Sequence, residues 1–419
     1  MLKNNGLPVT IWRPGAVLAL SLLLILLLAA CQQVTPAPTA APTARPSPAV
    51  PPAPPTSPPP AKNAPAYTAF WQAEALASSA STFAGAPLPA ERGALFSGAG
   101  ACAVCHTNMR DQAGKDVSVD KMWRATMLAN AARDPYWRAT VRSEVNQAPQ
   151  LGGEIEKKCA QCHTPMAEVT LSAGKQPVAL LDQGLFNPAN PLHPLANDGV
   201  SCTLCHQVEP GNLGKPESFS GGYLIDTLKP QGQRVTYGPY QIGRNQADVM
   251  QVTSGFMPVQ GLHLERSEMC GTCHDLVTPY VDGAGKVAGE FGEQLVYSEW
   301  ANSAYAKTKT CQACHMPQGQ GGVQLSITGG PLRQPFYQHV LVGGNAYMAR
   351  LMQQNGEALQ VVGAPEHFAA TIQRTVEQIS TATARLTLQN PRLENGALLA
   401  DLAVENLAGH KFPAGFPSR

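Results

Sequence analysis

The stretch Cys102-Ala-Val-Cys105-His106 is one of five segments of this 419-residue chain in which two cysteines stand three positions apart and a histidine follows the second cysteine. The other four are Cys159-Ala-Gln-Cys162-His163, Cys202-Thr-Leu-Cys205-His206, Cys270-Gly-Thr-Cys273-His274 and Cys311-Gln-Ala-Cys314-His315. The chain has 11 cysteines and 10 histidines. The five segments therefore use every cysteine except Cys31, and they leave five histidines for other roles.

This spacing is the attachment motif of c-type haem. Its two thiols can form thioethers with the two vinyl groups of one porphyrin, and the adjacent imidazole is then placed to bind the iron as the proximal ligand. We therefore expect five covalently bound haem c groups. The expected proximal iron ligands are His106, His163, His206, His274 and His315.

Three other uses of paired cysteines account for the pattern less well. Zinc sites would combine the motifs two by two, which five motifs cannot do evenly. Disulfides would leave the five motif histidines unexplained. A thioredoxin-like redox site needs one motif and not five.

The histidines outside the motifs are His193, His263, His339, His367 and His410. Their number equals one distal ligand for each haem, and six-coordinate iron suits electron transfer because no ligand has to be exchanged. We predict all five as distal ligands. His367 is the weakest candidate, because it lies on the polar side of an expected helix over 366–379. Met122 or Met127, on an expected helix over 118–132, is the alternative ligand of the first haem.

The N-terminal segment indicates export. Lys3 and Arg13 precede an apolar run over 16–30, which is shorter than the ~20 residues that a membrane span needs. The run ends in Leu-Ala-Ala-Cys31 and resembles a bacterial lipoprotein signal with its lipobox. The resemblance implies cleavage of residues 1–30 and lipid attachment to Cys31, so that acyl chains hold the protein to the cell envelope, on the periplasmic side or at the outer surface. An uncleaved anchor helix is the alternative.

Residues 31–66 are expected to be a linker, because 34–65 are almost wholly Pro, Ala, Thr and Ser and such a composition favours an extended chain at ~3.1 Å per residue. The formal net charge is +1, so nothing indicates nucleic-acid binding. Two propionates on each haem would make the loaded protein acidic, which favours a cationic redox partner. The oligomeric state is left open.

We expect the fold to be mainly α with much irregular loop, built around stacked haems, because 37 prolines and 38 glycines interrupt regular structure. Asp134-Pro135 predicts a helix start. The haem domain should span 67–380. Alternating residues around Asn395-Gly396 predict two strands, which would begin a small β-rich domain over 381–419 that is cut short at Arg419.

Several further segments resemble bacterial multihaem c-type cytochromes, the broad group that includes the tetrahaem cytochrome partnered with hydroxylamine oxidoreductase. They are Ser298-Glu299-Trp300, the Met316-Pro317 that follows the fifth motif, the stretch 339–345 and Gly409-His410-Lys411-Phe412-Pro413. The resemblance covers about Pro87 to Arg419. It implies haems stacked in parallel or perpendicular pairs, and distal roles for His339 and His410.

From this we expect a non-enzymatic electron carrier that exchanges electrons with redox partner proteins or an extracellular acceptor. The alternative is a multihaem oxidoreductase in which one open iron reacts with a small nitrogen or sulfur compound. Pentahaem nitrite reductases carry a Cys-x-x-Cys-Lys motif, which is absent here and counts against that enzyme. A subunit of a conductive filament is a third interpretation.

Overall fold

The computed structural model describes residues 83–413, all of which belong to one unit of the chain, Asn63–Arg419. The expected signal peptide 1–30, the lipidation site Cys31 and the linker 31–66 lie outside the described residues. Within 83–413, every helix is too short or too polar to cross a membrane.

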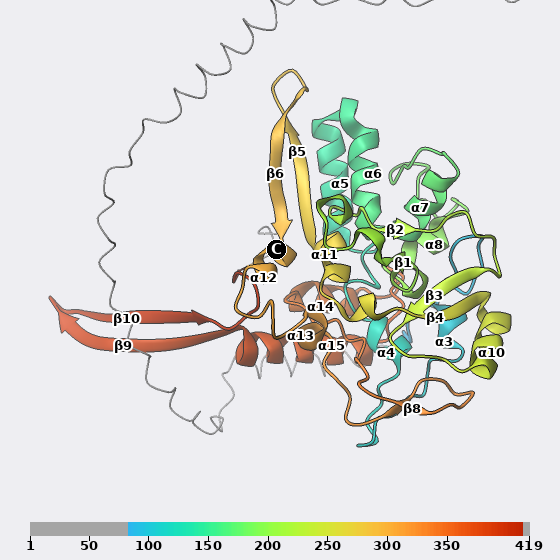
Figure 1. Cartoon of the computed structure of the whole chain (residues 1–419). Coiled ribbons are helices and arrows are strands. Elements are labelled where there is room, and N and C mark those ends of the chain that lie inside the picture. Colours follow the sequence, from blue (N-terminus) through green and yellow to red (C-terminus); the bar gives the residue numbers. More distant parts are fainter. Residues whose placement is uncertain (1–82, 414–419) are drawn as a thin grey trace, which may run out of the picture. The chain divides into compact units, whose positions relative to one another are not determined.

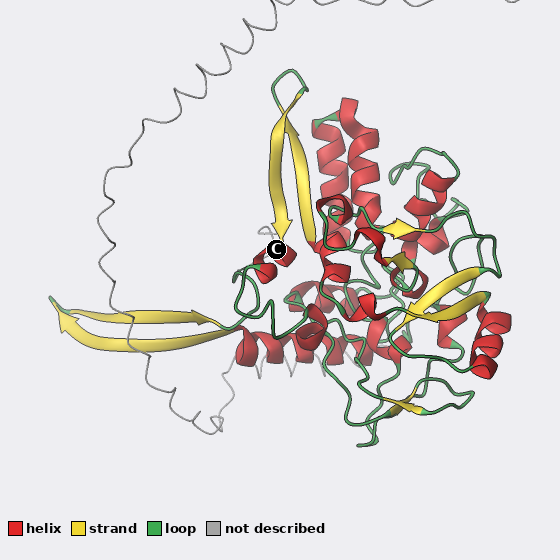
Figure 2. Cartoon of the chain, viewed as in Figure 1, coloured by secondary structure: helices red, strands yellow, loops and turns green. Residues whose placement is uncertain are grey.

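The expectation of a mainly α fold is wrong. Helices make up 37% of the residues and strands 18%, and Figure 2 shows both kinds of element interspersed with long loops. The strands form five separate two-stranded sheets in the described part of the chain. Four of these sheets escaped prediction because their strands are short or irregular. The hairpin of β5 (Asp275–Val281) and β6 (Val287–Leu295) contains Pro279 and Gly289 and two register shifts, so no clean alternation of polar and apolar residues is visible.

The helices, all but α9 labelled in Figure 1, are α3 (Gly100–Ala103), α4 (Val119–Trp123), α5 (Pro135–Gln147), α6 (Gly152–His163), α7 (Pro165–Ala173), α8 (His193–Asn197), α9 (Cys202–Cys205), α10 (Arg244–Ser254), α11 (Glu268–His274), α12 (Val296–Ala301), α13 (Cys311–His315), α14 (Ala346–Gln354) and α15 (Pro365–Gln378). The remaining strands are β1 (Val208–Glu209), β2 (Leu224–Ile225), β3 (Arg234–Gly238), β4 (Phe256–Gln260), β7 (Val323–Gln324), β8 (Leu332–Arg333), β9 (Ala384–Glu394) and β10 (Ala397–Asn406). Only β3 and β4 pair in parallel; the other four pairs are antiparallel.

One of the predicted helices is confirmed by the structure and another is wrong. The helix expected over 366–379 is confirmed as α15, with Phe368, Ile372 and Val376 buried. The helix expected over 118–132 is wrong, because only α4 forms and turns follow it. Polar side chains compete for the backbone there: the amide of Asn130 donates to the carbonyl oxygens of Arg124 and Thr126, and such bonds favour turns over helix.

The apolar side chains of the described residues pack in five separate clusters. One joins α14 to α15 through Met352, Phe368 and Ile372, each at most 1% exposed. Another joins α5 and α6 through Trp137, Val141 and Ala160. No single core dominates, which leaves room between the clusters for a large internal cavity.

The two strands expected near the C-terminus are confirmed as β9 and β10. Asn395 and Gly396 connect them with φ angles of +50° and +78°, as a tight hairpin turn requires. Pairing places leucines and valines opposite one another on one face: Leu386 with Val404, Leu388 with Leu402, and Leu393 with Leu398. All six side chains are more than half exposed. The hairpin therefore has one apolar face that nothing in the described residues covers; whether it begins a larger β-domain stays a prediction.

The start of α5 gives a test of this description. The Asp134 carboxylate accepts hydrogen bonds from the backbone N–H groups of Tyr136 and Trp137 at 2.9 and 3.2 Å, as predicted for a helix cap. Replacing it in Asp134→Ala should lower the free energy of unfolding by about 1 kcal/mol. Asp248→Ala, at an exposed ion pair on α10, should change stability much less. Equal losses in thermal or denaturant unfolding would contradict this account.

Candidate haem-binding cavity

One cavity of about 2640 Å³ connects all five cysteine motifs. An ordinary small-molecule pocket measures ~300–1,000 Å³, so this volume suits several large ligands and not one. All five motif histidines and nine of the ten motif cysteines, all but Cys105, line the cavity. The first and fifth motifs begin 209 positions apart in the sequence, and the fold brings all five to one space.

Each motif lies on or at the end of a short helix: α3, the last turn of α6, α9, the last turn of α11, and α13. In a helix, residues three positions apart project from the same side. The two thiols of a motif are thereby presented toward a single ligand. None of the ten cysteines forms a disulfide, so every thiol is available for a thioether.

Four of the motif histidines are held through Nδ1 by a backbone carbonyl from another part of the chain. The partners are Leu325 for His106 at 2.7 Å, Ala131 for His163 at 3.1 Å, Tyr237 for His206 at 2.6 Å, and Val342 for His315. Such a bond places the proton on Nδ1 and the lone pair on Nε2, which is how proteins prepare a histidine to bind a metal. The four rings therefore have the orientation and tautomer that an axial ligand would need.

Burial also favours the neutral imidazole that a metal requires. Removal from water lowers the pKa of His206, of His274 and of His315 below the usual value, because the charged form loses its hydration. The three rings are therefore neutral near pH 7.

Two histidines outside the motifs face motif histidines across the cavity. The ring centres of His206 and His339 are 6.4 Å apart with 16° between the planes, and those of His315 and His410 are 6.4 Å apart with 13° between the planes. Two imidazoles bound at ~2 Å on opposite sides of one metal ion have ring centres roughly 6 Å apart. Both pairs thus have the spacing of a bis-histidine iron site.

The other three predicted distal ligands do not line the cavity. Both ring nitrogens of His193 are engaged, Nδ1 with the Leu185 carbonyl at 2.8 Å and Nε2 with the Asn197 amide at 3.0 Å. Nε2 of His263 contacts the Val208 carbonyl oxygen at 2.9 Å. Both nitrogens of His193 are thus engaged by protein groups, whereas within residues 83–413 only one nitrogen of His263 is.

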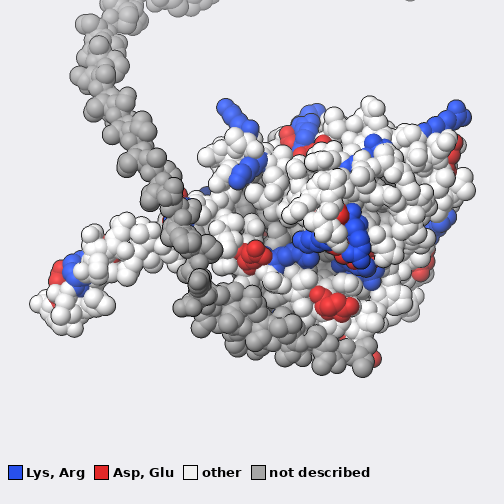
Figure 3. Space-filling model, turned by 90° about the horizontal axis from the view of Figure 1, so that it is seen from below, with Lys and Arg blue, Asp and Glu red and all other residues white. Residues whose placement is uncertain are grey.

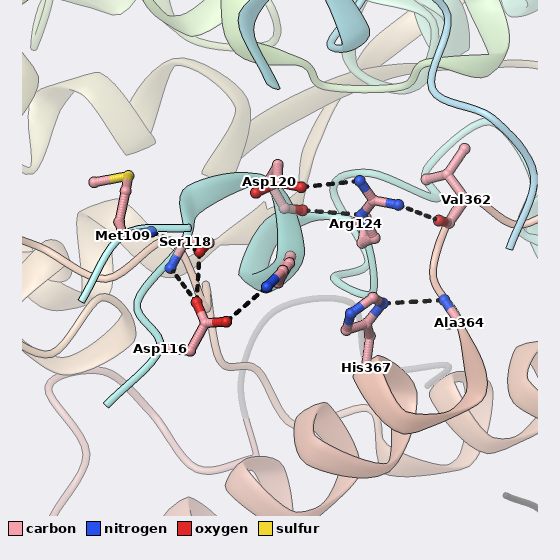
Figure 4. Close-up of polar contacts among 9 residues, drawn as sticks. Met109, Asp116, Ser118, Asp120, Arg124, Val362, Ala364 and His367 are labelled. Atoms are coloured by element: carbon pink, nitrogen blue, oxygen red, sulfur yellow. Dashed lines mark hydrogen bonds and ion pairs between the residues drawn. The ribbon is translucent and has the colours of Figure 1, made fainter. Parts of the chain in front are cut away.

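His367 has a structural role at the start of α15. Its Nδ1 accepts a hydrogen bond from the backbone N–H of Ala364 at 3.1 Å, as Figure 4 shows. Nearby, the Arg124 guanidinium links the Asp120 carboxylate, at 3.0 Å, to the Val362 carbonyl, at 3.3 Å. This network holds the start of α15 next to α4. It gives the His367 side chain a structural role that does not require binding to iron.

The two methionines proposed as alternative ligands lie in different surroundings. Met122 is buried in an apolar cluster with Met109 and Val117 and does not line the cavity. Met127 does line it. Of the two, Met127 is the one that the fold leaves as a candidate ligand.

Large aromatic residues line the cavity, among them Trp123, Trp137, Trp300 and Tyr305. Trp137 also stacks on the His163 ring, with ring centres 4.2 Å apart and 3° between the planes. The hydroxyl of Thr236 on β3 lines the cavity, is buried and has no hydrogen-bond partner. An apolar, aromatic cavity with a buried hydroxyl suits a porphyrin with its carboxylate side chains, so the residues present fit haem.

Thiols of different motifs touch one another. Side-chain contacts join Cys102 to Cys202, Cys162 to Cys273, and Cys270 to Cys311. Ligands tethered by these cysteines would have neighbouring edges. The contacts link the first motif to the third, the second to the fourth, and the fourth to the fifth.

No group of three or more His, Cys, Asp or Glu side chains within residues 83–413 is arranged to hold a bare metal ion. Haem iron takes four of its ligands from the porphyrin and one or two from the protein, so such a group is not needed. Comparisons of the chain with models of protein families, with curated proteins and with solved structures gave no match.

The polar loop in Figure 4 gives a pH prediction. Burial alone would raise the pKa of Asp116, but hydrogen bonds from Lys121, at 2.7 Å, and from Ser118 outweigh it and lower the pKa to about 2. A folded-state pKa below the usual 3.8 means that the carboxylate stabilises the fold above about pH 4 and that this contribution is lost as the pH falls toward 2. In Asp116→Asn, unfolding measured across this range should show a weaker acid dependence; an unchanged profile would refute the assignment.

Proposed function

We propose that this chain is an exported, lipid-anchored pentahaem c-type cytochrome that transfers electrons. The observation that carries the proposal is the single cavity that all five motifs share. Five separate surface motifs would suit five unrelated sites, whereas a shared cavity suits closely spaced haems between which electrons hop. The family resemblance of the motifs and flanking segments supports the same conclusion.

The proposed axial pairs are His206 with His339 and His315 with His410. Six-coordinate iron with two imidazoles does not exchange ligands when it changes oxidation state, and it therefore suits a carrier. Proximal ligation by the other motif histidines follows from the motif itself. The thiol contacts between motifs support short transfer steps between neighbouring haems.

Charge bears on the partner. The chain has a formal net charge of +1, and on the face drawn in Figure 3 Lys and Arg side chains lie beside Asp and Glu side chains. Ten propionates would make the loaded protein acidic. We therefore propose, as partners, redox proteins with basic surfaces or an extracellular acceptor, reached from the lipid anchor at Cys31.

The number of haems is the first test. The chain, produced in a host that matures c-type cytochromes, should carry five covalently attached haems by intact mass under denaturing conditions. A Cys159→Ala, Cys162→Ala double variant should carry four. A protein without added porphyrin mass would end the proposal.

The axial pairs have their own test. Electron paramagnetic resonance of the oxidised protein should show that His339→Ala and His410→Ala each convert one low-spin haem to high spin. His193→Ala is the matched control: its imidazole is bonded to protein groups, so the coordination of every haem should stay unchanged. A loss of low-spin signal in the control, or its full retention in both test variants, would contradict the pairing.

One observation favours the alternative, an oxidoreductase. Within residues 83–413, His339 and His410 are the two histidines outside the motifs that line the cavity. The irons bound by His106, His163 and His274 therefore face no histidine from this set, and an open iron can bind a small molecule. Oxidation of the fully reduced protein by nitrite or hydroxylamine, together with a high-spin signal in the unmodified protein, would favour the enzyme over the carrier.

A further inference from the structure

We propose that Asp198 is a proton-binding site coupled to the reduction of the haems tethered at the first and third motifs. The proposal rests on the proposed function, because it needs haem at Cys102 and Cys202. It adds proton uptake to electron transfer and assigns it to one carboxyl group.

Asp198 lies between the two helices that carry these motifs. It directly follows α8 and is completely buried. Its Oδ2 accepts a hydrogen bond at 2.8 Å from the backbone N–H of Ala99, the residue before α3. Ser201, the residue before α9, is adjacent to the same carboxyl group. One carboxyl group therefore sits at the start of both motif helices.

The Asp198 carboxyl group has fewer hydrogen-bond partners than its two oxygens can accept. Its Oδ1 is buried and has no hydrogen-bond partner. Arg133 is the cation that acts on it most, yet the two do not form an ion pair: the Arg133 guanidinium donates to the Ala129 carbonyl at 3.0 Å, and its Nε has no partner. A buried carboxylate with so few partners is stabilised poorly in its charged form.

The negative charge of Asp198 acts on both Cys102 and Cys202, the cysteines at which the two haems are tethered. The thiols of Cys102 and Cys202 touch each other, and the Asp198 carboxylate acts on both. The titratable and charged groups that surround these three residues are Glu91, Arg92, Arg133 and Arg138. A change of charge at either haem would act strongly on this carboxyl group, because its surroundings are buried and little water screens the electrostatic interaction.

Burial raises the pKa of Asp198 to about 6, so the group titrates near physiological pH. In the coupled step, one Fe(III) takes one electron from a donor such as dithionite and becomes Fe(II), and the carboxylate takes one proton from water and becomes a carboxylic acid. No other bond changes. Because reduction removes one positive charge from the haem, it strengthens proton binding at Asp198. The midpoint potential should therefore fall as the pH rises above 6.

The proton needs a path from the cavity to Asp198. Asp198 itself does not line the cavity, but Ser201 and Ala99 do. Ser201 therefore both neighbours the carboxyl group and lines the cavity. In this proposal, protons reach Asp198 from the cavity past this side chain.

The experiment is a redox titration of the holoprotein between about pH 4.5 and about pH 8, a range that brackets this carboxyl group. In the unmodified protein, the midpoint potentials of the two haems should fall as the proton concentration drops, and the two slopes together should reach at most about 59 mV per tenfold drop, because one carboxyl group takes up one proton. In Asp198→Asn this slope should vanish. Asp116→Asn is the matched control: it removes a carboxylate that stays charged throughout this range, so it should leave the slope unchanged.

Haem propionates also titrate, and the variants distinguish them. If Asp198→Asn retains the slope, the propionates bind the proton and the inference is wrong. If the mass shows five haems and no potential depends on pH, the inference fails while the proposed function stands. Absence of haem would overturn both.

If Asp198→Asn does not fold, the unmodified protein labelled with ¹³C at the aspartate carboxyl groups decides. Reduction near pH 6.5 should produce a labelled carboxylic-acid band in the infrared difference spectrum, which propionates cannot give. Its absence would overturn the inference.

Discussion

The structure depends on one constraint: five cysteine motifs from distant parts of the sequence open onto the same apolar cavity. The apolar clusters of the described residues are small and separate, and aromatic side chains such as Trp123, Trp137 and Trp300 line the shared space. Under the proposed function, porphyrin supplies the apolar surface that would otherwise join the clusters. Folding and haem attachment are then linked, because neither the side chains that line the cavity nor the haems form a core alone.

Some features of the structure could be predicted from the sequence and others could not. The motifs depend only on local spacing, and α5 and α15 follow from a cap and an apolar stripe, so these could be identified from the residues. The backbone carbonyls that hold His106, His206 and His315 could not, because every residue has a carbonyl and no pattern marks the one that will be used. The strands other than β9 and β10 escaped prediction because they are short or because glycines and prolines break their alternation.

The distal histidines illustrate the same limit. Counting gave five candidates for five irons, and the geometry favours two. His193 and His367 are occupied by bonds to nearby residues, an outcome that depends on local turns and helix starts and not on composition. His339 and His410 face their partners only because loops more than 90 residues away in sequence return to the cavity. The contacts between thiols also show which motifs are neighbours in space, which the number of histidines could not indicate. The fourth motif, through Cys270 and Cys273, lies next to both the second and the fifth.

The bond between His106 and the Leu325 carbonyl joins residues 219 positions apart. Under the proposed function, the two thioethers beside His106 would require only a five-residue segment, whereas the orientation of its imidazole requires nearly the whole of the proposed haem-binding region. An enzyme that attaches haem to an emerging polypeptide could therefore work motif by motif, from the first to the fifth. Final coordination geometry at the first iron would still be among the last features to form, after the segment around residue 325 has crossed the membrane.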